Sequence, residues 1–167
     1  MTTNFKVLII GDGGVGKTNF IAMQSRNEFD RQYNPTIGIQ NTNILYKDII
    51  FTVSEFAGQE KYGFKKNVCD EIKPDAVILM YDCTSKISYK NILDWYNRVS
   101  SVKHVPMVLI GNKSDISHIK FDIPKLHIVL SNEIINQNLK YFEVSTKNNT
   151  NVREVFDYLY SRIMLNT

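Results

Sequence analysis

A glycine-rich stretch near the start of the chain carries the clearest chemical pattern in this sequence. It runs Gly11-Asp12-Gly13-Gly14-Val15-Gly16-Lys17-Thr18 and fits the spacing G-x-x-x-x-G-K-S/T. Glycines let backbone N–H groups converge on an anion at the positive end of a following helix. Lys17 would add an ammonium for outer phosphates, and Thr18 a hydroxyl oxygen for Mg²⁺. The pattern predicts a phosphate site, and a glycine-rich turn without a ligand is the alternative.

Two elements must hold this loop. The apolar run Phe5–Ile10 before it has the length of a buried strand, and Asn19–Gln24 after it can continue as a helix. The residues that we expect to hold the phosphates are Gly13, Gly14, Val15, Gly16, Lys17, Thr18 and Asn19.

Strand-like runs alternate with helical patterns along the rest of the chain, which predicts an α/β fold with a mainly parallel sheet. Asn43–Lys47 and Asp48–Ser54 would form a tight antiparallel hairpin at one edge. Ala76–Tyr81 and Pro106–Ile110 are continuous apolar runs, typical of strands covered on both faces. Tyr141–Val144 would be the last strand.

Two stretches have helical spacing. In the first, the repeated apolar positions are Tyr89, Ile92, Leu93, Tyr96 and Val99. Trp95 lies beside them, and we expect it to be partial core rather than a cofactor contact. The second opens at Asn151–Glu154, which resembles a capping box. Residues 116–138 are the hardest to interpret, although a short helix beginning at Ser131 is possible.

Composition excludes several classes of protein. The chain has 167 residues, 43% hydrophobic and 22% charged, which indicates one globular domain rather than disorder. Its net charge of +3 comes from scattered lysines, so no nucleic-acid surface is expected. Cys69 and Cys83 have no metal-ligand spacing, which suggests a reduced, intracellular protein. No signal peptide, membrane span, lipid-anchor cysteine or histidine cluster is apparent; the histidines are His104, His118 and His127.

A second chemical motif, Asn112-Lys113-Ser114-Asp115, follows the apolar run Pro106–Ile110. It would therefore lie at the carboxyl edge of the sheet, where open α/β sheets bind ligands. An aspartate there can accept hydrogen bonds from N1–H and the exocyclic amine of guanine, a pair of donors that adenine does not present. The motif predicts a guanine nucleotide at the phosphate loop.

Together these motifs resemble the Ras superfamily of small GTPases over nearly the whole chain. The resemblance implies one domain, residues 1–167, with a P-loop NTPase three-layer sandwich. Its sheet would have six mostly parallel strands with one antiparallel edge strand, beside about five helices. It also implies GTP/GDP and Mg²⁺ as ligands and slow hydrolysis of GTP to GDP and phosphate.

The resemblance assigns further site residues. Thr36, in Tyr33–Gly38, matches the first-switch threonine that senses Mg²⁺ and the γ-phosphate, and Tyr33 would also contact the nucleotide. Ala57-Gly58-Gln59-Glu60 matches the second switch, where Gln59 would orient the attacking water and Gly58 contact the γ-phosphate. Phe29 matches the aromatic residue that packs on the guanine. The implied guanine loop contacts are Ser145, Thr146 and Lys147; the implied metal residues are Thr18, Thr36 and Glu55; the implied catalytic residues are Gln59, Lys17 and Thr36.

Within the superfamily the chain is most similar to Ran, and next to Rab, on Phe5–Gly14, Gln59–Gly63 and Ser88–Trp95. That implies a monomer of the cytoplasm or nucleus, acting in nucleocytoplasmic transport or related signalling. Exchange factor, activating protein and effectors would bind through residues 30–40 and 55–70. A Rab-like trafficking GTPase, or a non-catalytic GTP-binding mimic that occupies regulators, is the alternative. A nucleotide kinase would need a second acceptor site, for which no motif is seen.

The chain departs from the family at Glu55-Phe56, where the family has Asp-Thr. The family's aspartate contacts a water in the magnesium shell. Either the longer carboxylate of Glu55 reaches that water after a small backbone shift, or magnesium coupling to the second switch is weakened. In the second case, Glu55→Asp with Phe56→Thr should raise the single-turnover rate. Ran proteins also continue beyond the last domain helix, whereas this sequence ends at Thr167. Either the chain is trimmed or the protein lacks that switch element.

Overall fold

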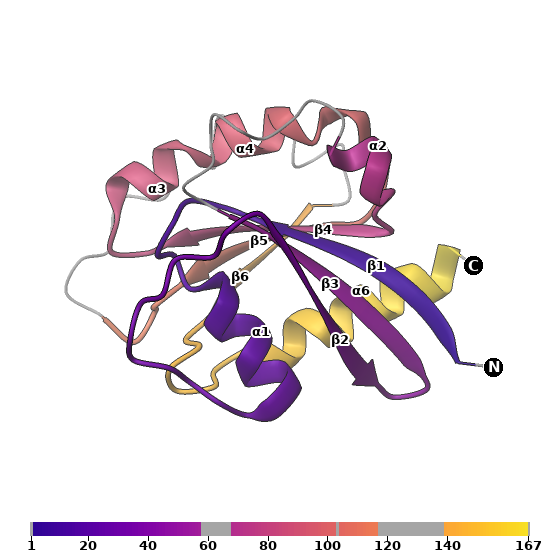
Figure 1. The fold of residues 1–167 in the computed structure, drawn as a ribbon, viewed down its shortest axis with the longest axis horizontal. Helices are drawn as coiled ribbons and strands as arrows, with labels where there is room; N and C mark the ends of the chain where they lie inside the picture. Colours follow the sequence, from indigo (N-terminus) through magenta and orange to yellow (C-terminus); the bar gives the residue numbers. More distant parts are fainter. Residues whose placement is uncertain (1, 58–67, 103, 117–138, 167) are drawn as a thin grey trace.

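The computed structural model describes residues 2–57, 68–102, 104–116 and 139–166 (Figure 1). Its six-stranded sheet has the order β2-β3-β1-β4-β5-β6. The strands are β1 Thr3–Ile10, β2 Ile39–Tyr46, β3 Ile49–Phe56, β4 Ala76–Asp82, β5 Met107–Asn112 and β6 Leu139–Glu143. Every neighbouring pair is parallel except β2 with β3. The predicted mostly parallel sheet with one antiparallel edge strand is therefore confirmed.

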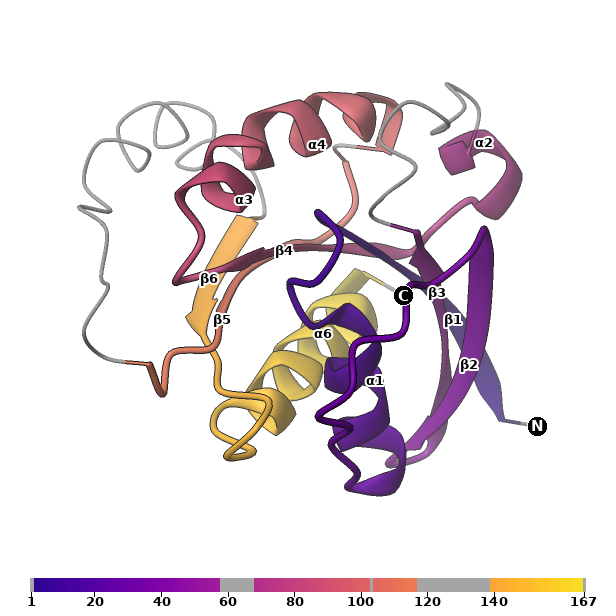
Figure 2. The same cartoon turned by 60° about the vertical axis from the view of Figure 1, so that its left-hand side comes forward.

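Helices cover both faces of this sheet. They are α1 Lys17–Arg26, α2 Val68–Ile72, α3 Lys86–Lys90, α4 Ile92–Arg98 and α6 Val152–Asn166, with a 3-10 turn at Ser100–Val102. Figures 1 and 2 show α1 and α6 on one face and α2, α3 and α4 on the other. The result is the predicted three-layer α/β sandwich.

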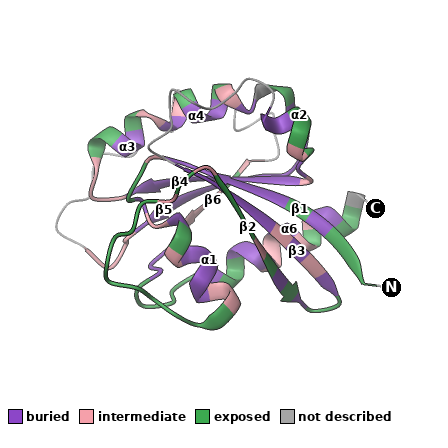
Figure 3. Ribbon diagram, in the orientation of Figure 1, coloured by how far each residue is buried: buried purple, intermediate pink, exposed green. Residues whose placement is uncertain are grey.

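The sheet divides two apolar cores because successive strand residues point to opposite faces. On β1, Val7 and Ile9 pack into the core with Phe20 of α1 and Phe156 of α6. The next residue along, Leu8, packs into the other core, which we call the α4 core and which includes Trp95 and Tyr96. Figure 3 shows the buried residues concentrated along the central strands. Burial on both faces explains the continuous apolar runs of β1 and β4.

The edge hairpin is longer than its predicted strands. A two-residue turn at Lys47-Asp48 joins β2 to β3, and Lys47 has a φ of 55°. Pairing continues from Tyr46 opposite Ile49 to Ile39 opposite Phe56. The polar pattern of residues 39–42 concealed the start of β2, because this edge strand has little apolar surface to bury. The extension brings the end of β3 beside the end of β1.

The two helical patterns are confirmed with differences in detail. The first is split at Asn91 into α3 and α4, and Trp95 is fully buried rather than partial core. The second helix begins at Val152 as predicted, but Asn151 has a φ of 59°, not the extended backbone of a capping-box residue. Its side-chain amide instead donates a 2.8 Å hydrogen bond to the Glu143 carbonyl.

Some predictions lie outside the described residues, including the helix from Ser131 and the positions of His118 and His127. Among described residues, Cys69 and Cys83 form no disulfide, and no group of His, Cys, Asp or Glu side chains has a metal-binding arrangement. None of the helices in the described ranges has the length and apolar character needed to cross a membrane.

Candidate functional site

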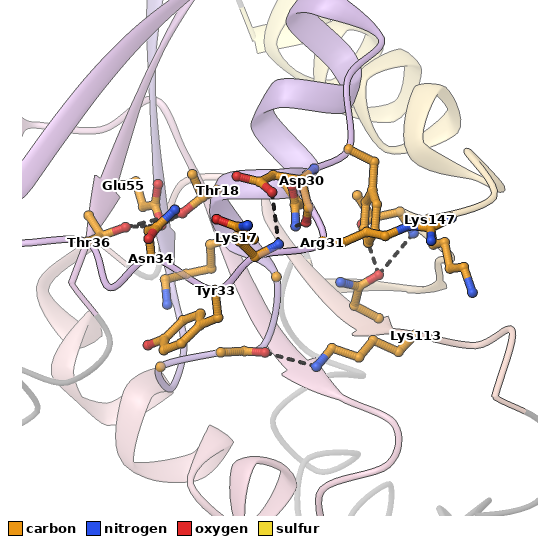
Figure 4. Close-up of a pocket in the computed structure, with 18 of the residues that line it drawn as sticks. Lys17, Thr18, Asp30, Arg31, Tyr33, Asn34, Thr36, Glu55, Lys113 and Lys147 are labelled. Atoms are coloured by element: carbon orange, nitrogen blue, oxygen red, sulfur yellow. Dashed lines mark hydrogen bonds between the residues drawn. The ribbon is translucent and has the colours of Figure 1, made fainter.

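A cavity of about 400 Å³ lies at the carboxyl edge of the sheet, beside the start of α1 (Figure 4). This is the volume of a small-molecule site. Most of the predicted site residues line it: Gly13, Gly14, Gly16, Lys17, Thr18, Asn19, Phe29, Tyr33, Thr36, Glu55, Asn112, Lys113, Asp115, Thr146 and Lys147. Segments more than a hundred residues apart in sequence are thus brought to one hollow.

The glycine-rich loop reaches the cavity because it passes very close to neighbouring strands. At Gly11, with a φ of 152°, an added Cβ would collide with the Met80 carbonyl of β4. At Gly16, with a φ of 102°, it would collide with the Asn112 side chain. Val15 does not line the cavity: its side chain is buried in the core with Phe20. Any phosphate contact at Val15 would therefore come from its backbone.

Lys17 lies at the floor of the loop. Its ammonium donates 2.9 Å hydrogen bonds to the carbonyls of Gly11 and Asp12. Burial lowers the pKa of Lys17 to about 8, although the carboxylates of Glu55 and then Asp12 raise it. A phosphate beside this ammonium would favour its charged form, so the residue is suited to binding an anion.

Asp12 is an anchor that the sequence did not reveal. One carboxylate oxygen accepts a 2.6 Å hydrogen bond from the Asn91 amide, and the other accepts a 2.7 Å bond from the Trp95 indole nitrogen. These donors come from the helical layer over the α4 core. An acidic residue within a phosphate-binding loop is electrostatically unfavourable unless its side chain is held away from the ligand. The acidic side chain at position 12 was therefore the one feature of the sequence that could have predicted this anchor.

Three oxygen-bearing side chains meet at one end of the cavity (Figure 4). The Thr18 and Thr36 hydroxyls donate hydrogen bonds of 2.7 and 3.1 Å to Oε1 of Glu55, and the two hydroxyl oxygens lie 3.1 Å apart. Glu55 is only 4% exposed. Two hydroxyls and a carboxylate are the hard oxygen donors that Mg²⁺ prefers, so this cluster fits the ion.

The backbone of Glu55 is fixed within the sheet. It pairs with Ile9 of β1 on one side and Gln40 of β2 on the other. Its neighbour Phe56 is buried in the α4 core with Leu8 and Val68. The side chain therefore reaches the two threonines through its own length, with β3 still paired on both sides.

Asn112 connects the opposite end of the cavity to the loop. Its amide donates a 2.9 Å bond to the Val15 carbonyl, and its oxygen accepts bonds of 3.1 and 2.9 Å from the N–H and hydroxyl of Thr146. Because Asn112 is buried, losing these bonds would leave polar groups unsatisfied. It ties three chain segments together.

Asp115 and Lys113 are each held by a second residue. Asp115 accepts a 2.7 Å bond from the Ser145 hydroxyl, which is buried and does not itself line the cavity. The Lys113 ammonium forms an ion pair of 2.6 Å with Asp82 and donates a 2.9 Å bond to the Gly14 carbonyl. Figure 4 shows Lys113 and Lys147 at the end of the cavity opposite Thr36 and Glu55.

The loop after α1 closes the cavity from the side. The Asn19 amide donates a 2.8 Å bond to the Asp30 carbonyl and accepts one of 2.8 Å from its N–H, so Asn19 holds the loop backbone. Phe29 and Tyr33 are 37% and 58% exposed at the rim. The sequence missed four other lining residues of this loop, because a polar loop without periodicity gives no signal for them: Asp30, Arg31, Gln32 and Asn34. It also missed Ile116, which follows Asp115. The predicted Gly58 and Gln59 lie outside the described residues.

A comparison with protein families agrees with this arrangement. A family model described as the Ras family matches residues 6–165. The chain belongs to the Ras family. Members of the Ras family are small GTPases that bind guanine nucleotides and generally hydrolyse GTP, so this chain is a GTP-binding switch domain. The resemblance drawn from the motifs is confirmed at this level, whereas the narrower Ran and Rab assignments are not decided by the family match.

Proposed function

We propose that this Ras-family chain is a single-domain, Ran-like switch that binds GTP or GDP with Mg²⁺ and hydrolyses GTP slowly. The observation that carries the proposal is the convergence of three groups on one cavity. They are the phosphate loop, the oxygen cluster of Thr18, Thr36 and Glu55, and the pair Asn112 and Asp115. Each group serves a different part of a magnesium–guanine nucleotide.

The phosphates would lie against the loop N–H groups of residues 13–19, over the start of α1. Lys17 would exchange its two carbonyl partners for the outer phosphate oxygens, which are stronger acceptors because they are charged. Mg²⁺ supplies positive charge where negative charge develops on the transferring phosphoryl group. Thr18, Thr36 and Glu55 would hold the ion there.

The base would lie between Asp115 and the rim aromatic Phe29. The bond from Ser145 orients the Asp115 carboxylate toward guanine N1–H and the exocyclic amine. Lys147 and Thr146 would complete the guanine pocket, and Tyr33 would cover the phosphates. A carboxylate that faces adenine in the pocket would lack both donors, which is the physical basis for guanine selectivity.

The switch would act through Thr36. Loss of the γ-phosphate would release Thr36 and Gly58, and residues 30–40 and 55–70 would then change their fit to exchange factors, activating proteins and effectors. Gln59 would orient the attacking water, with an activating protein completing the site. The Ran-like role, as a monomer of the cytoplasm or nucleus, rests on the segments Phe5–Gly14 and Ser88–Trp95.

The nucleotide released from the purified protein by heat tests this proposal. We expect GDP or GTP at about one equivalent, and phosphate release from the GTP complex that stops when Mg²⁺ is chelated. Lys17→Met should lose the nucleotide, whereas Lys140→Met, at an exposed lysine of β6, should retain it. An adenine nucleotide, or none in either protein, would contradict the proposal.

A second candidate is a GTP-binding module that does not hydrolyse and only occupies Ran or Rab regulators. Glu55 in place of the family's aspartate favours it, whereas Gln59 and Gly13, which match the family pattern, speak against it. Single-turnover hydrolysis with and without a Ran-type activating protein separates the two. Acceleration supports the switch; a bound, unhydrolysed GTP under both conditions supports the module.

A further inference from the structure

The oxygen cluster has dimensions that a set of direct metal ligands would also have. Its three edges are 2.7 Å from Thr18 Oγ1 to Glu55 Oε1, 3.1 Å from Thr36 Oγ1 to Glu55 Oε1, and 3.1 Å between the hydroxyls. Octahedral Mg²⁺ holds oxygens at about 2.0–2.1 Å, which places adjacent ligand oxygens about 2.9 Å apart. The cluster thus has the size of one triangular face of a magnesium octahedron.

We propose that the Glu55 carboxylate binds Mg²⁺ directly, beside the hydroxyls of Thr18 and Thr36. The inference deepens the proposed function and rests on it, since it assigns one residue a more specific part in the same site. The family's aspartate reaches the magnesium shell only through a water, so the ligand set here would differ from the family pattern.

The length of the side chain explains the difference. Pairing with Ile9 and Gln40 fixes the Glu55 backbone in β3, so only the side chain sets how far the carboxylate extends. An aspartate at this position would end one carbon–carbon bond, about 1.5 Å, further from the threonines. That is too short to complete the triangle and leaves room for a water.

Charge and burial favour the same assignment. Glu55 is 4% exposed, and its described partners in the cluster are two neutral hydroxyls, with the Lys17 ammonium acting on it only through space. A buried carboxylate is stabilised most by a cation at contact distance. Mg²⁺ at the face of the triangle would supply that charge once both hydroxyls turn their hydrogens away from Oε1 and their lone pairs to the ion.

Direct ligation has a consequence for the switch. Three protein oxygens, one of them charged, would retain the metal more strongly than two hydroxyls. After the γ-phosphate has left and Thr36 has moved away, Thr18 and Glu55 would still hold the ion against the remaining phosphates. Bound GDP should then tolerate lower Mg²⁺ concentrations than it does in an aspartate variant.

Water counting tests the ligand set. Mn²⁺ replaces Mg²⁺ in the complex with a non-hydrolysable GTP analogue, and broadening of the Mn²⁺ resonance in ¹⁷O-enriched water reports its water ligands. Of six octahedral positions, three protein oxygens and two phosphate oxygens leave one water in the natural protein. Glu55→Asp should show two. Glu154→Asp, at an exposed residue of α6, is the matched control and should show one.

The metal requirement provides a second measurement. The Mg²⁺ concentration that half-protects bound GDP from release should rise about tenfold or more in Glu55→Gln, and be unchanged in Glu154→Gln. Two outcomes would overturn direct ligation and leave the proposed function standing. One is two water ligands on Mn²⁺ in the natural protein with nucleotide bound. The other is a change of less than twofold in the half-protecting Mg²⁺ concentration of Glu55→Gln. Chromatography of the same samples reports bound nucleotide, and its absence from all of them would overturn the proposed function and this inference together.

Discussion

The indole nitrogen of Trp95 donates a 2.7 Å hydrogen bond to the carboxylate of Asp12, joining a fully buried helix residue to the phosphate loop. Asn91 donates to the other oxygen of the same carboxylate. The position of the loop is therefore set by the packing of α3 and α4 on the sheet as well as by its own glycines. Trp95 is also the single tryptophan of the chain.

This bond should appear as a coupling energy between Asp12 and Trp95. Asp12→Ala removes the carboxylate that accepts from the buried indole N–H and should cost about 1–3 kcal/mol of unfolding free energy. When combined with Trp95→Phe, the loss should be smaller than the sum by about 1–2 kcal/mol. Urea unfolding followed by circular dichroism, at saturating GDP, measures it. Pairing Trp95→Phe with the exposed Asp70→Ala should give no coupling; additive losses in both cycles would contradict the anchor.

Base selectivity should follow the hydrogen-bonding groups of residue 115. Asp115→Asn replaces two acceptors by one acceptor and one donor, which suits xanthine because xanthine has a carbonyl where guanine has its amine. The ratio of xanthine to guanine nucleotide affinity should rise about a hundredfold or more. Ser145→Ala keeps the Asp115 carboxylate but removes the hydroxyl that donates to it and accepts from the Asn148 N–H, and it should weaken guanine nucleotides without favouring xanthine. An unchanged ratio in Asp115→Asn would place the base elsewhere.

The rate of GTP hydrolysis should depend on the length of the side chain at position 55. On the proposed ligand set, Glu55→Asp would restore the water-mediated arrangement of the family, and we expect the single-turnover rate of GTP hydrolysis to rise about tenfold. Phosphate release after adding Mg²⁺ to the preformed GTP complex measures this rate. The same rate in both proteins would show that the glutamate already supports the family's coupling.

Replacing Phe56 by the family's threonine should lower the free energy of unfolding. Phe56 is 4% exposed in the α4 core, so Phe56→Thr removes most of a buried ring and places a hydroxyl in its space. We expect a loss of roughly 3–5 kcal/mol in unfolding free energy, as for other buried Phe truncations. Urea unfolding at saturating GDP checks this; a loss under 1 kcal/mol would mean that the core closes around the smaller side chain. Glu55→Asp alone is consequently the sharper test of hydrolysis.

The sequence predicted the parts of the site whose chemistry is local. The phosphate loop and Asn112–Asp115 are each recognisable from a few consecutive residues, and both line the cavity. The apolar runs of β1, β4 and β5 indicate burial on both faces. Contacts such as Asp12 with Trp95 depend on how α4 packs over the sheet, which no local pattern encodes. Likewise, the Glu55 substitution was visible in the sequence, but its reach to Thr18 depends on the pairing of β3 with both neighbouring strands.

Guanine-nucleotide binding at the cavity is tested most directly by competition. The protein is loaded with fluorescent GDP at a Mg²⁺ concentration that keeps it bound, and unlabelled nucleotides are added at equilibrium. We predict that GTP and GDP displace it near stoichiometric concentration, whereas ATP at a thousandfold higher concentration does not. Equal displacement by ATP and GTP would contradict the assignment of this Ras-family cavity as a guanine site.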